Sequence, residues 1–135
     1  MEAKLTEFMT RLHEQNATFS CLDFRSFSIE EIGDNDFVYA DPPYLITCAA
    51  YNEQGGWTQK HEYALLGLLD DLNERNIKFA LSNVIESKGK RNAILQEWID
   101  KQNYRMVNLN YSYKNSNYQR KNKESETKEI LVVNY

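Results

Sequence analysis

The sequence predicts a single α/β domain, in which a mainly parallel sheet carries helices and closes in a C-terminal antiparallel hairpin. Short apolar segments alternate with segments whose apolar residues recur every three to four positions, which is typical of strands alternating with helices. The last two apolar segments have no helical segment between them, which favours an antiparallel pair. A length of 135 residues is enough for one domain, residues 1–135, with its own core.

The first part of the chain predicts one helix and two strands. A helix is expected over residues 3–15, where four apolar side chains share one face: Leu5, Phe8, Met9 and Leu12. The apolar run at residues 17–22 predicts a first strand. Residues 26–33 form a connector with one helical turn, and a buried strand is expected at residues 37–40.

The middle of the chain predicts a helix followed by a strand. Thr58 is a candidate N-cap for a helix over residues 59–75, which carries its apolar face on Leu65, Leu66, Leu69 and Leu72. Trp57 precedes this helix and is expected to pack in the core, with a place in a pocket wall as the alternative. The next strand is expected over residues 77–81, ending in Ser82-Asn83.

The last part of the chain predicts a helix over residues 90–102, after a break at Gly89, and then two strands. These strands, residues 104–109 and 130–135, are expected to form the antiparallel pair around a long loop. His13 and His61 lie on predicted helices, so we expect both to face solvent without a chemical role.

Polar residues follow three of the predicted strands at their carboxyl ends. Asp23 follows the first, Asp41 the second, and Ser82-Asn83 the third. Ligands of α/β sheets bind beyond the carboxyl ends of the strands, so a site is expected there. For Asp23 the alternative is a plain turn former, and for Ser82-Asn83 a helix cap or turn.

The tetrad Asp41-Pro42-Pro43-Tyr44 contains both prolines of the chain. Proline fixes its own φ and keeps the preceding residue extended, so the tetrad forms a rigid turn. The Asp41 carboxylate and the Pro42 carbonyl are both acceptors. Together they could hold the two hydrogens of a planar amine, while Tyr44 stacks on the ring that carries it. A simple turn is the alternative, which the position directly after a strand disfavours.

Charge is unevenly distributed along the chain. The net charge of −4 argues weakly against a nucleic-acid partner, but residues 110–128 hold five Lys or Arg and only two Glu. Cations interleaved with tyrosines suit contacts with phosphates and bases. The candidate nucleic-acid-binding residues are Tyr113, Lys114, Arg120, Lys121 and Lys123. A solvated hairpin tip is an equally weighted alternative.

Cysteine usage and hydropathy indicate the cellular location of the protein. Cys21 and Cys48 lack metal-ligand spacing and are expected to be reduced, structural thiols. No apolar run approaches the roughly 20 residues of a membrane span, and the N-terminus lacks a signal-peptide pattern. We therefore expect a cytoplasmic protein with no membrane partner and no metal.

The tetrad and its surroundings resemble the Dam-type DNA adenine-N6 methyltransferases of bacteria and phages. Residues 37–45 resemble the catalytic segment of that family, and residues 79–83 its next strand. Asp23-Phe24 resembles the acidic-aromatic pair that contacts the adenosine end of S-adenosylmethionine. Residues 129–135 resemble the last strand of the family, so the resemblance covers roughly residues 17–135.

The resemblance implies direct transfer of a methyl group from S-adenosylmethionine to adenine N6 in double-stranded DNA. The catalytic residues would be Asp41, Pro42, Pro43 and Tyr44, which hold an adenine flipped out of the duplex. The cofactor would contact Asp23, Phe24 and Asp41. The rate would come from positioning and electrostatics, since the residues suggest no nucleophile-base pair.

The glycine-containing cofactor loop of that family has no counterpart among the five glycines of the chain. We therefore expect the C-terminal portion of a catalytic domain, with a partial Rossmann-like methyltransferase sheet. A complementary N-terminal half or self-association could fill the gap, because unpaired strand edges invite pairing. Two alternatives stay open: an inactive remnant with weak DNA binding, and an enzyme that methylates another amine, in cytosine N4, RNA or protein.

Overall fold

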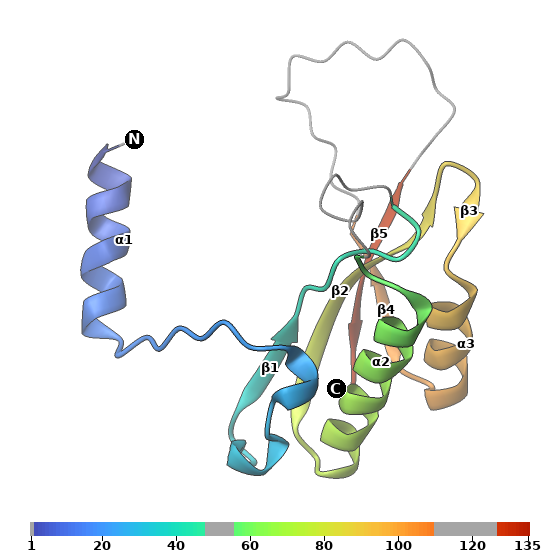
Figure 1. The fold of residues 1–135 in the computed structure, drawn as a ribbon, viewed down its shortest axis with the longest axis horizontal. Helices are drawn as coiled ribbons and strands as arrows, with labels where there is room; N and C mark the ends of the chain where they lie inside the picture. The colour runs from blue at the N-terminus through green and yellow to red at the C-terminus, as the bar shows by residue number, and fades with distance from the viewer. Residues whose placement is uncertain (1, 48–55, 110–126) are drawn as a thin grey trace, which may run out of the picture.

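The computed structural model describes residues 2–47, 56–109 and 127–135 (Figure 1). The helices and strands follow the predicted alternation, which confirms the α/β fold class. In chain order they are α1 (Glu2–Glu14), the 3-10 turns η1 (Phe24–Ser26) and η2 (Ile29–Glu31), β1 (Phe37–Ala40), α2 (Gln59–Glu74), β2 (Lys78–Ser87), β3 (Lys90–Arg91), α3 (Ala93–Gln102), β4 (Arg105–Asn108) and β5 (Lys128–Val133).

The described strands form one mixed sheet in the order β1-β2-β5-β4, with the short β3 paired to β2. β1 and β2 run parallel, whereas β5 is antiparallel to both of its neighbours, β2 and β4. The predicted antiparallel pair at the C-terminal end is therefore confirmed. β5 lies inside the sheet, so β1, β2 and β4 all point in one direction.

Helices α2 and α3 cover one face of the sheet and enclose the core (Figure 1). Phe79 of β2 is fully buried there, with its ring centroid 5.3 Å from Tyr104 and 6.3 Å from Trp98. The polar ends of this aromatic group share one acceptor on α2. Asp70 Oδ1 accepts hydrogen bonds from Trp98 Nε1 at 2.8 Å and from the Tyr104 hydroxyl at 3.0 Å. Burial and this carboxylate raise the pKa of Tyr104.

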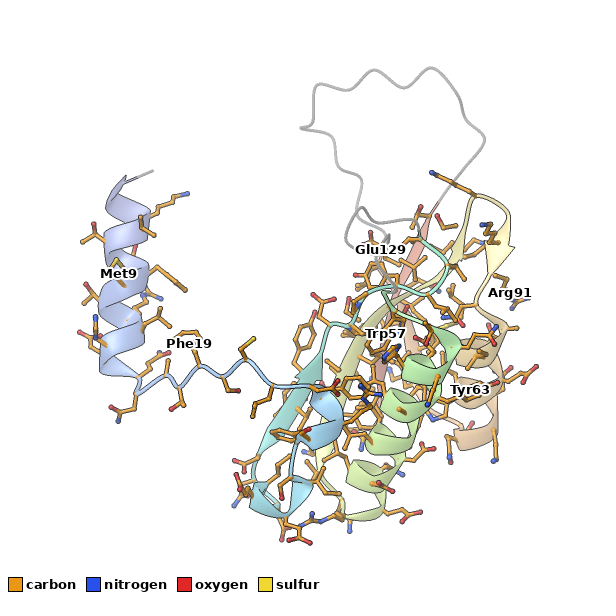
Figure 2. The ribbon with its side chains drawn as sticks, in the orientation of Figure 1. Met9, Phe19, Trp57, Tyr63, Arg91 and Glu129 are labelled. Carbon is orange, nitrogen blue, oxygen red and sulfur yellow. The ribbon has the colours of Figure 1, made fainter. Side chains whose placement is uncertain are left out.

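The strand predicted at residues 17–22 does not form. The segment is extended and solvent-exposed, with Phe19 77% and Leu22 74% exposed. A strand needs a neighbour for its backbone N–H and C=O groups, and no described residue pairs with this segment. Beyond it, α1 stands apart from the sheet (Figure 1), and Met9 and Phe19 are exposed at a distance from the sheet (Figure 2).

Strand β1 forms where predicted, but it is not buried. Phe37 and Tyr39 are 52% and 60% exposed, whereas Val38 and Ala40 pack against the core. The reason is its place in the sheet. Within the described residues β1 pairs with β2 alone and forms one edge, and α2 and α3 cover only the face that carries Val38 and Ala40.

Strand β2 is longer than predicted, so Ser82 and Asn83 lie inside it rather than at its end. The antiparallel partner β5 continues the pairing, with Ser82 opposite Leu131 and Asn83 opposite Ile130. Helix α3 then begins later than predicted, because residues 90–91 pair with β2 as β3. The Asn92 side chain caps α3 by accepting from the Leu95 N–H at 3.1 Å.

The cysteines and the length of the helices were also subjects of prediction. Cys21 is a free thiol but is exposed, so its predicted structural role is wrong; it lies in the extended segment, with which no described strand pairs. Cys48 lies outside the described residues. None of the described helices is both long and apolar enough to cross a membrane.

Candidate active site

The tetrad lies at the carboxyl end of β1, on the wall of a hollow of about 710 Å³. Asp41, Pro42 and Pro43 line it, and so do Asp23 and Phe24 from the segment before β1. Most of the remaining lining is apolar. The volume suits a small-molecule ligand, and three of the four predicted catalytic residues share this cavity with the predicted cofactor-binding residues.

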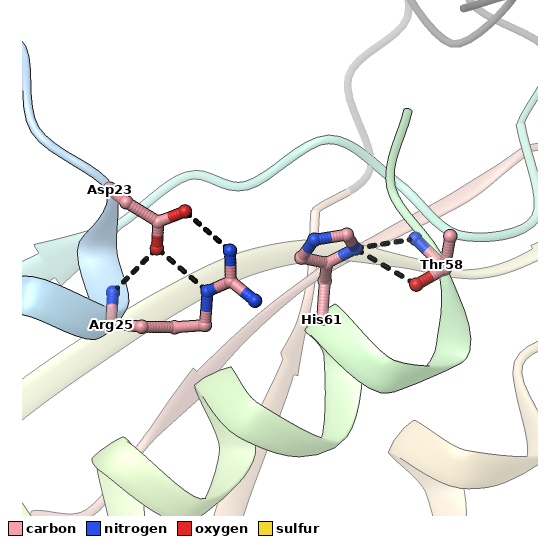
Figure 3. Close-up of polar contacts among 4 residues, drawn as sticks. All are labelled: Asp23, Arg25, Thr58 and His61. Atoms are coloured by element: carbon pink, nitrogen blue, oxygen red, sulfur yellow. Dashed lines mark hydrogen bonds and ion pairs between the residues drawn. The ribbon is translucent and has the colours of Figure 1, made fainter. Parts of the chain in front are cut away.

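Asp23 is held at this hollow by its near neighbour Arg25 (Figure 3). Asp23 Oδ1 accepts from the Arg25 backbone N–H at 2.9 Å and from Nε at 2.8 Å, and Oδ2 accepts from a terminal guanidinium nitrogen at 2.6 Å. These hydrogen bonds hold the pKa of Asp23 well below its usual value. The carboxylate is therefore charged and fixed as the N-cap of η1. A ligand hydroxyl would have to share it with Arg25 or displace the guanidinium.

Two aromatic residues complete the wall next to Phe24. The Trp57 ring centroid lies 5.5 Å from that of Phe24 and 5.5 Å from that of His61, on which it stacks. Thr58 is the N-cap of α2, as predicted, and His61 Nδ1 lies 3.2 Å from its backbone nitrogen and 2.8 Å from its hydroxyl (Figure 3). The prediction for His61 is therefore wrong, because the ring caps α2 and lines the hollow. Trp57 is half-buried, packs against the core and lines the hollow too, so it fills both of its predicted roles.

A buried carboxylate lies directly behind Trp57. Glu62 is fully buried, and its Oε2 accepts from Trp57 Nε1 at 2.5 Å. Its Oε1 accepts from Asn92 Nδ2 at 2.9 Å, with Asn83 Nδ2 more distant at 3.5 Å. A buried charge is costly unless it is hydrogen-bonded, and Glu62 meets this condition through donors from three separate segments.

Glu62 is not among the predicted site residues, although its position in the sequence carries a signal. Glu62 precedes Leu65 and Leu66 by three and four residues, so it lies on the apolar face of α2. An acidic residue in phase with buried leucines needs a partner. Asn83 is that partner in part, which gives it a structural role behind the wall instead of a place at a strand end.

Tyr44 lies next to Asp41 but is not among the described residues that line the hollow. Its hydroxyl donates to Asp41 Oδ1 at 3.4 Å. Burial raises the pKa of Tyr44, a hydrogen bond with Ser82 opposes that shift, and the Asp41 charge adds to it. The phenol therefore stays a neutral donor beside the exposed Asp41 carboxylate. The predicted DNA-contacting residues Tyr113, Lys114, Arg120, Lys121 and Lys123 lie outside the described residues.

Comparison with known proteins identifies the family. Residues 1–122 match the D12 class N6 adenine-specific DNA methyltransferases, and the chain belongs to this family, which confirms the predicted resemblance. The whole chain aligns with the type II methyltransferase M.FokI of Planomicrobium okeanokoites at 41% identity and with the modification methylase StsI of Streptococcus sanguinis at 40%. Modification methylase LlaI of Lactococcus lactis subsp. lactis is 35% identical over 98% of the chain. The chain spans only 21%, 21% and 20% of the lengths of these three relatives.

Proposed function

We propose that this chain is the catalytic portion of a site-specific DNA adenine-N6 methyltransferase that uses S-adenosylmethionine. One observation carries the proposal: Asp41-Pro42-Pro43 lines the same hollow as Asp23-Phe24. The first group has the acceptors that an adenine amine requires, and the second has groups suited to an adenosine. Membership of the D12 family supports both assignments.

The amine of a flipped adenine would donate its two hydrogens to the Asp41 carboxylate and the Pro42 carbonyl. Holding both hydrogens directs the nitrogen lone pair away from these acceptors and toward the methyl donor. Tyr44 would stack on the base, and its hydroxyl keeps one Asp41 oxygen in place. The two prolines limit the motion of this turn, so its acceptors are positioned before the base arrives.

The hollow also fits the adenosine end of S-adenosylmethionine. The Phe24 and Trp57 rings meet at an interplanar angle of 40°, and such an aromatic corner can pack against a purine. The Asp23 carboxylate can accept hydrogen bonds from ribose hydroxyls once Arg25 shares or releases it. When bound, S-adenosylmethionine would supply an electrophilic methyl group. The residues of the chain would orient the amine and exclude water.

Further methyltransferase polypeptide would complete this site. Phe37, Tyr39 and Leu22 present exposed apolar surface at and beside the β1 edge, and such surface commonly marks an interface. We propose that a complementary methyltransferase segment covers it, with a second copy of the chain as the alternative. Double-stranded DNA would then approach the carboxyl edge of the sheet, where Asp41 lies.

A chimera tests the proposed function. The segment of M.FokI that matches this chain is replaced by this chain, and modified nucleosides in substrate DNA are measured by mass spectrometry, strand by strand. We expect N6-methyladenine. The Asp41→Ala variant should lose roughly a thousandfold in rate, the scale for removal of a group that acts in the transition state. Asp71→Ala, an exposed change on α2, is the matched control.

The same measurement separates the alternatives. N4-methylcytosine in place of N6-methyladenine would mean that the tetrad serves another amine. A folded chimera with the same activity as its Asp41→Ala variant on every strand would contradict the proposal and favour an inactive remnant.

A further inference from the structure

We propose that the β2–β3 hairpin binds the phosphate backbone of the DNA substrate through Lys88, Lys90 and Arg91. This inference rests on the proposed function, because it adds a DNA contact surface to that site. It concerns described residues of an element distinct from the basic segment at residues 110–128.

The hairpin projects from the sheet on the side of the tetrad. β1 ends at Ala40, opposite Leu81, but β2 continues to Ser87. At about 3.3 Å per residue this extension is roughly 20 Å. The hairpin therefore rises beyond the carboxyl edge of the sheet where Asp41 lies, with Arg91 on the side of α3 (Figures 1 and 2).

Two hollows connect the hairpin to the segment that directly follows the tetrad. One, of about 350 Å³, has Ile46 and Thr47 together with Lys90 and Arg91 in its wall. The other, of about 250 Å³, is lined by Ile46 and Thr47 together with Lys88 and Lys90. The three cations of the hairpin therefore border the surface over which a duplex would reach the tetrad.

The described part of the hairpin carries more positive than negative charge. Glu86 is the acidic residue at its base, and Lys128 pairs with it at 2.7 Å. Arg91 donates to Gln96 Oε1 at 3.0 Å and lies opposite Glu86, so it shares this one carboxylate with Lys128. Lys88 and Lys90 are exposed, and neither has an ion pair with a described residue. On a chain of net charge −4, this is a local positive surface that complements phosphates.

The conformation of Lys88 supports a role for its charge. Lys88 has φ 50° and Gly89 has φ 73°, so both central residues of this two-residue turn are left-handed, as in a type I′ turn. That turn favours Asn, Asp or Gly at both positions, and an L-residue with a long side chain is disfavoured there. The turn therefore carries a cation at a position where its backbone conformation disfavours lysine.

Salt-dependent DNA binding tests the inference. The full chain and a Lys88→Gln/Lys90→Gln variant are titrated with a short duplex at 50–300 mM salt, and fluorescence anisotropy gives the dissociation constant. Each lost phosphate contact should reduce the slope of log K against log[salt] by about 0.9, so we expect a slope shallower by about 1.8. At 0.1 M salt each lost contact should weaken binding by about eightfold.

The matched control is Lys78→Gln/Lys101→Gln, which removes the same charge at the opposite end of β2 and in the last turn of α3. Circular dichroism checks that all variants are folded. The inference would be overturned if the two double variants had equal slopes of log K against log[salt]. It would also be overturned if the wild-type chain showed no salt-dependent binding to the duplex. If the chimera methylates adenine while the slopes are equal, only the hairpin surface is rejected and the proposed function stands.

Discussion

Replacing Glu62 with leucine should destabilise the fold by about 3 kcal/mol. The substitution removes the acceptor of two donors, the half-buried Trp57 Nε1 at 2.5 Å and the buried Asn92 Nδ2 at 2.9 Å. Each unsatisfied donor costs about 1–3 kcal/mol. Part of this is offset because an apolar side chain removes the desolvation penalty of a buried carboxylate. The Asn83 contact at 3.5 Å adds little.

Urea unfolding followed by circular dichroism measures this effect. With a slope of about 1.5 kcal/mol per molar urea, the midpoint should fall by about 2 M. Glu97→Ala, an exposed change on α3, should stay within about 0.5 kcal/mol of wild type. Trp57→Phe completes a double-mutant cycle with Glu62→Leu, and we expect a coupling free energy of about 1.5–3 kcal/mol. A midpoint of Glu62→Leu that matches Glu97→Ala would refute the reasoning, because the carboxylate would then not hold these donors.

Three further substitutions have defined outcomes. The folded-state pKa of Tyr104 is raised, so the neutral phenol stabilises the fold fully below the unfolded pKa of about 10 and less as the pH rises further. Tyr104→Phe should therefore lessen the fall in the free energy of unfolding measured above pH 10. A fall as steep as in the wild type would contradict this. Arg25→Gln should raise the pKa of Asp23, measured by NMR titration, because the carboxylate loses its hydrogen-bond donors. The free energy of unfolding should change little because the pair is exposed, and an unshifted titration would contradict the pairing. Lys88→Asn should raise the free energy of unfolding, measured in urea, by up to about 1 kcal/mol, because asparagine suits the left-handed turn. A lower free energy of unfolding would show that the lysine is not strained.

Sequence periodicity predicted the helices well because their apolar faces are local. The leucines of α2 recur at helical spacing and all face the core, so no tertiary information is needed. Strands differ, because a strand requires a partner that the local sequence does not specify. Residues 17–22 have a strand-like composition and no described partner. β2 extends beyond its apolar run because β5 pairs with it from Ala80 to Glu86.

The site was predictable to the extent that its chemistry is contained in short motifs. Asp41-Pro42-Pro43 and Asp23-Phe24 are contiguous, and the fold brings them to one hollow. The roles of Glu62 and His61 depend on contacts made after folding. The helical phase of Glu62 places it on the apolar face of α2, but its partners Trp57 and Asn92 come from other segments, as does the ring that stacks on His61.

Glu62 also links the two surfaces that we assign to ligands. Through Trp57 it supports the wall of the hollow, and through Asn92 it holds the residue that directly follows Arg91 of the hairpin. One buried carboxylate therefore links the hairpin to the hollow, so a loss of Glu62 should change how the two surfaces lie relative to each other. Because Glu62 is fully buried, its loss removes no phosphate contact. Duplex affinity should fall while the salt slope keeps its wild-type value, which distinguishes a positioning residue from the cations it positions.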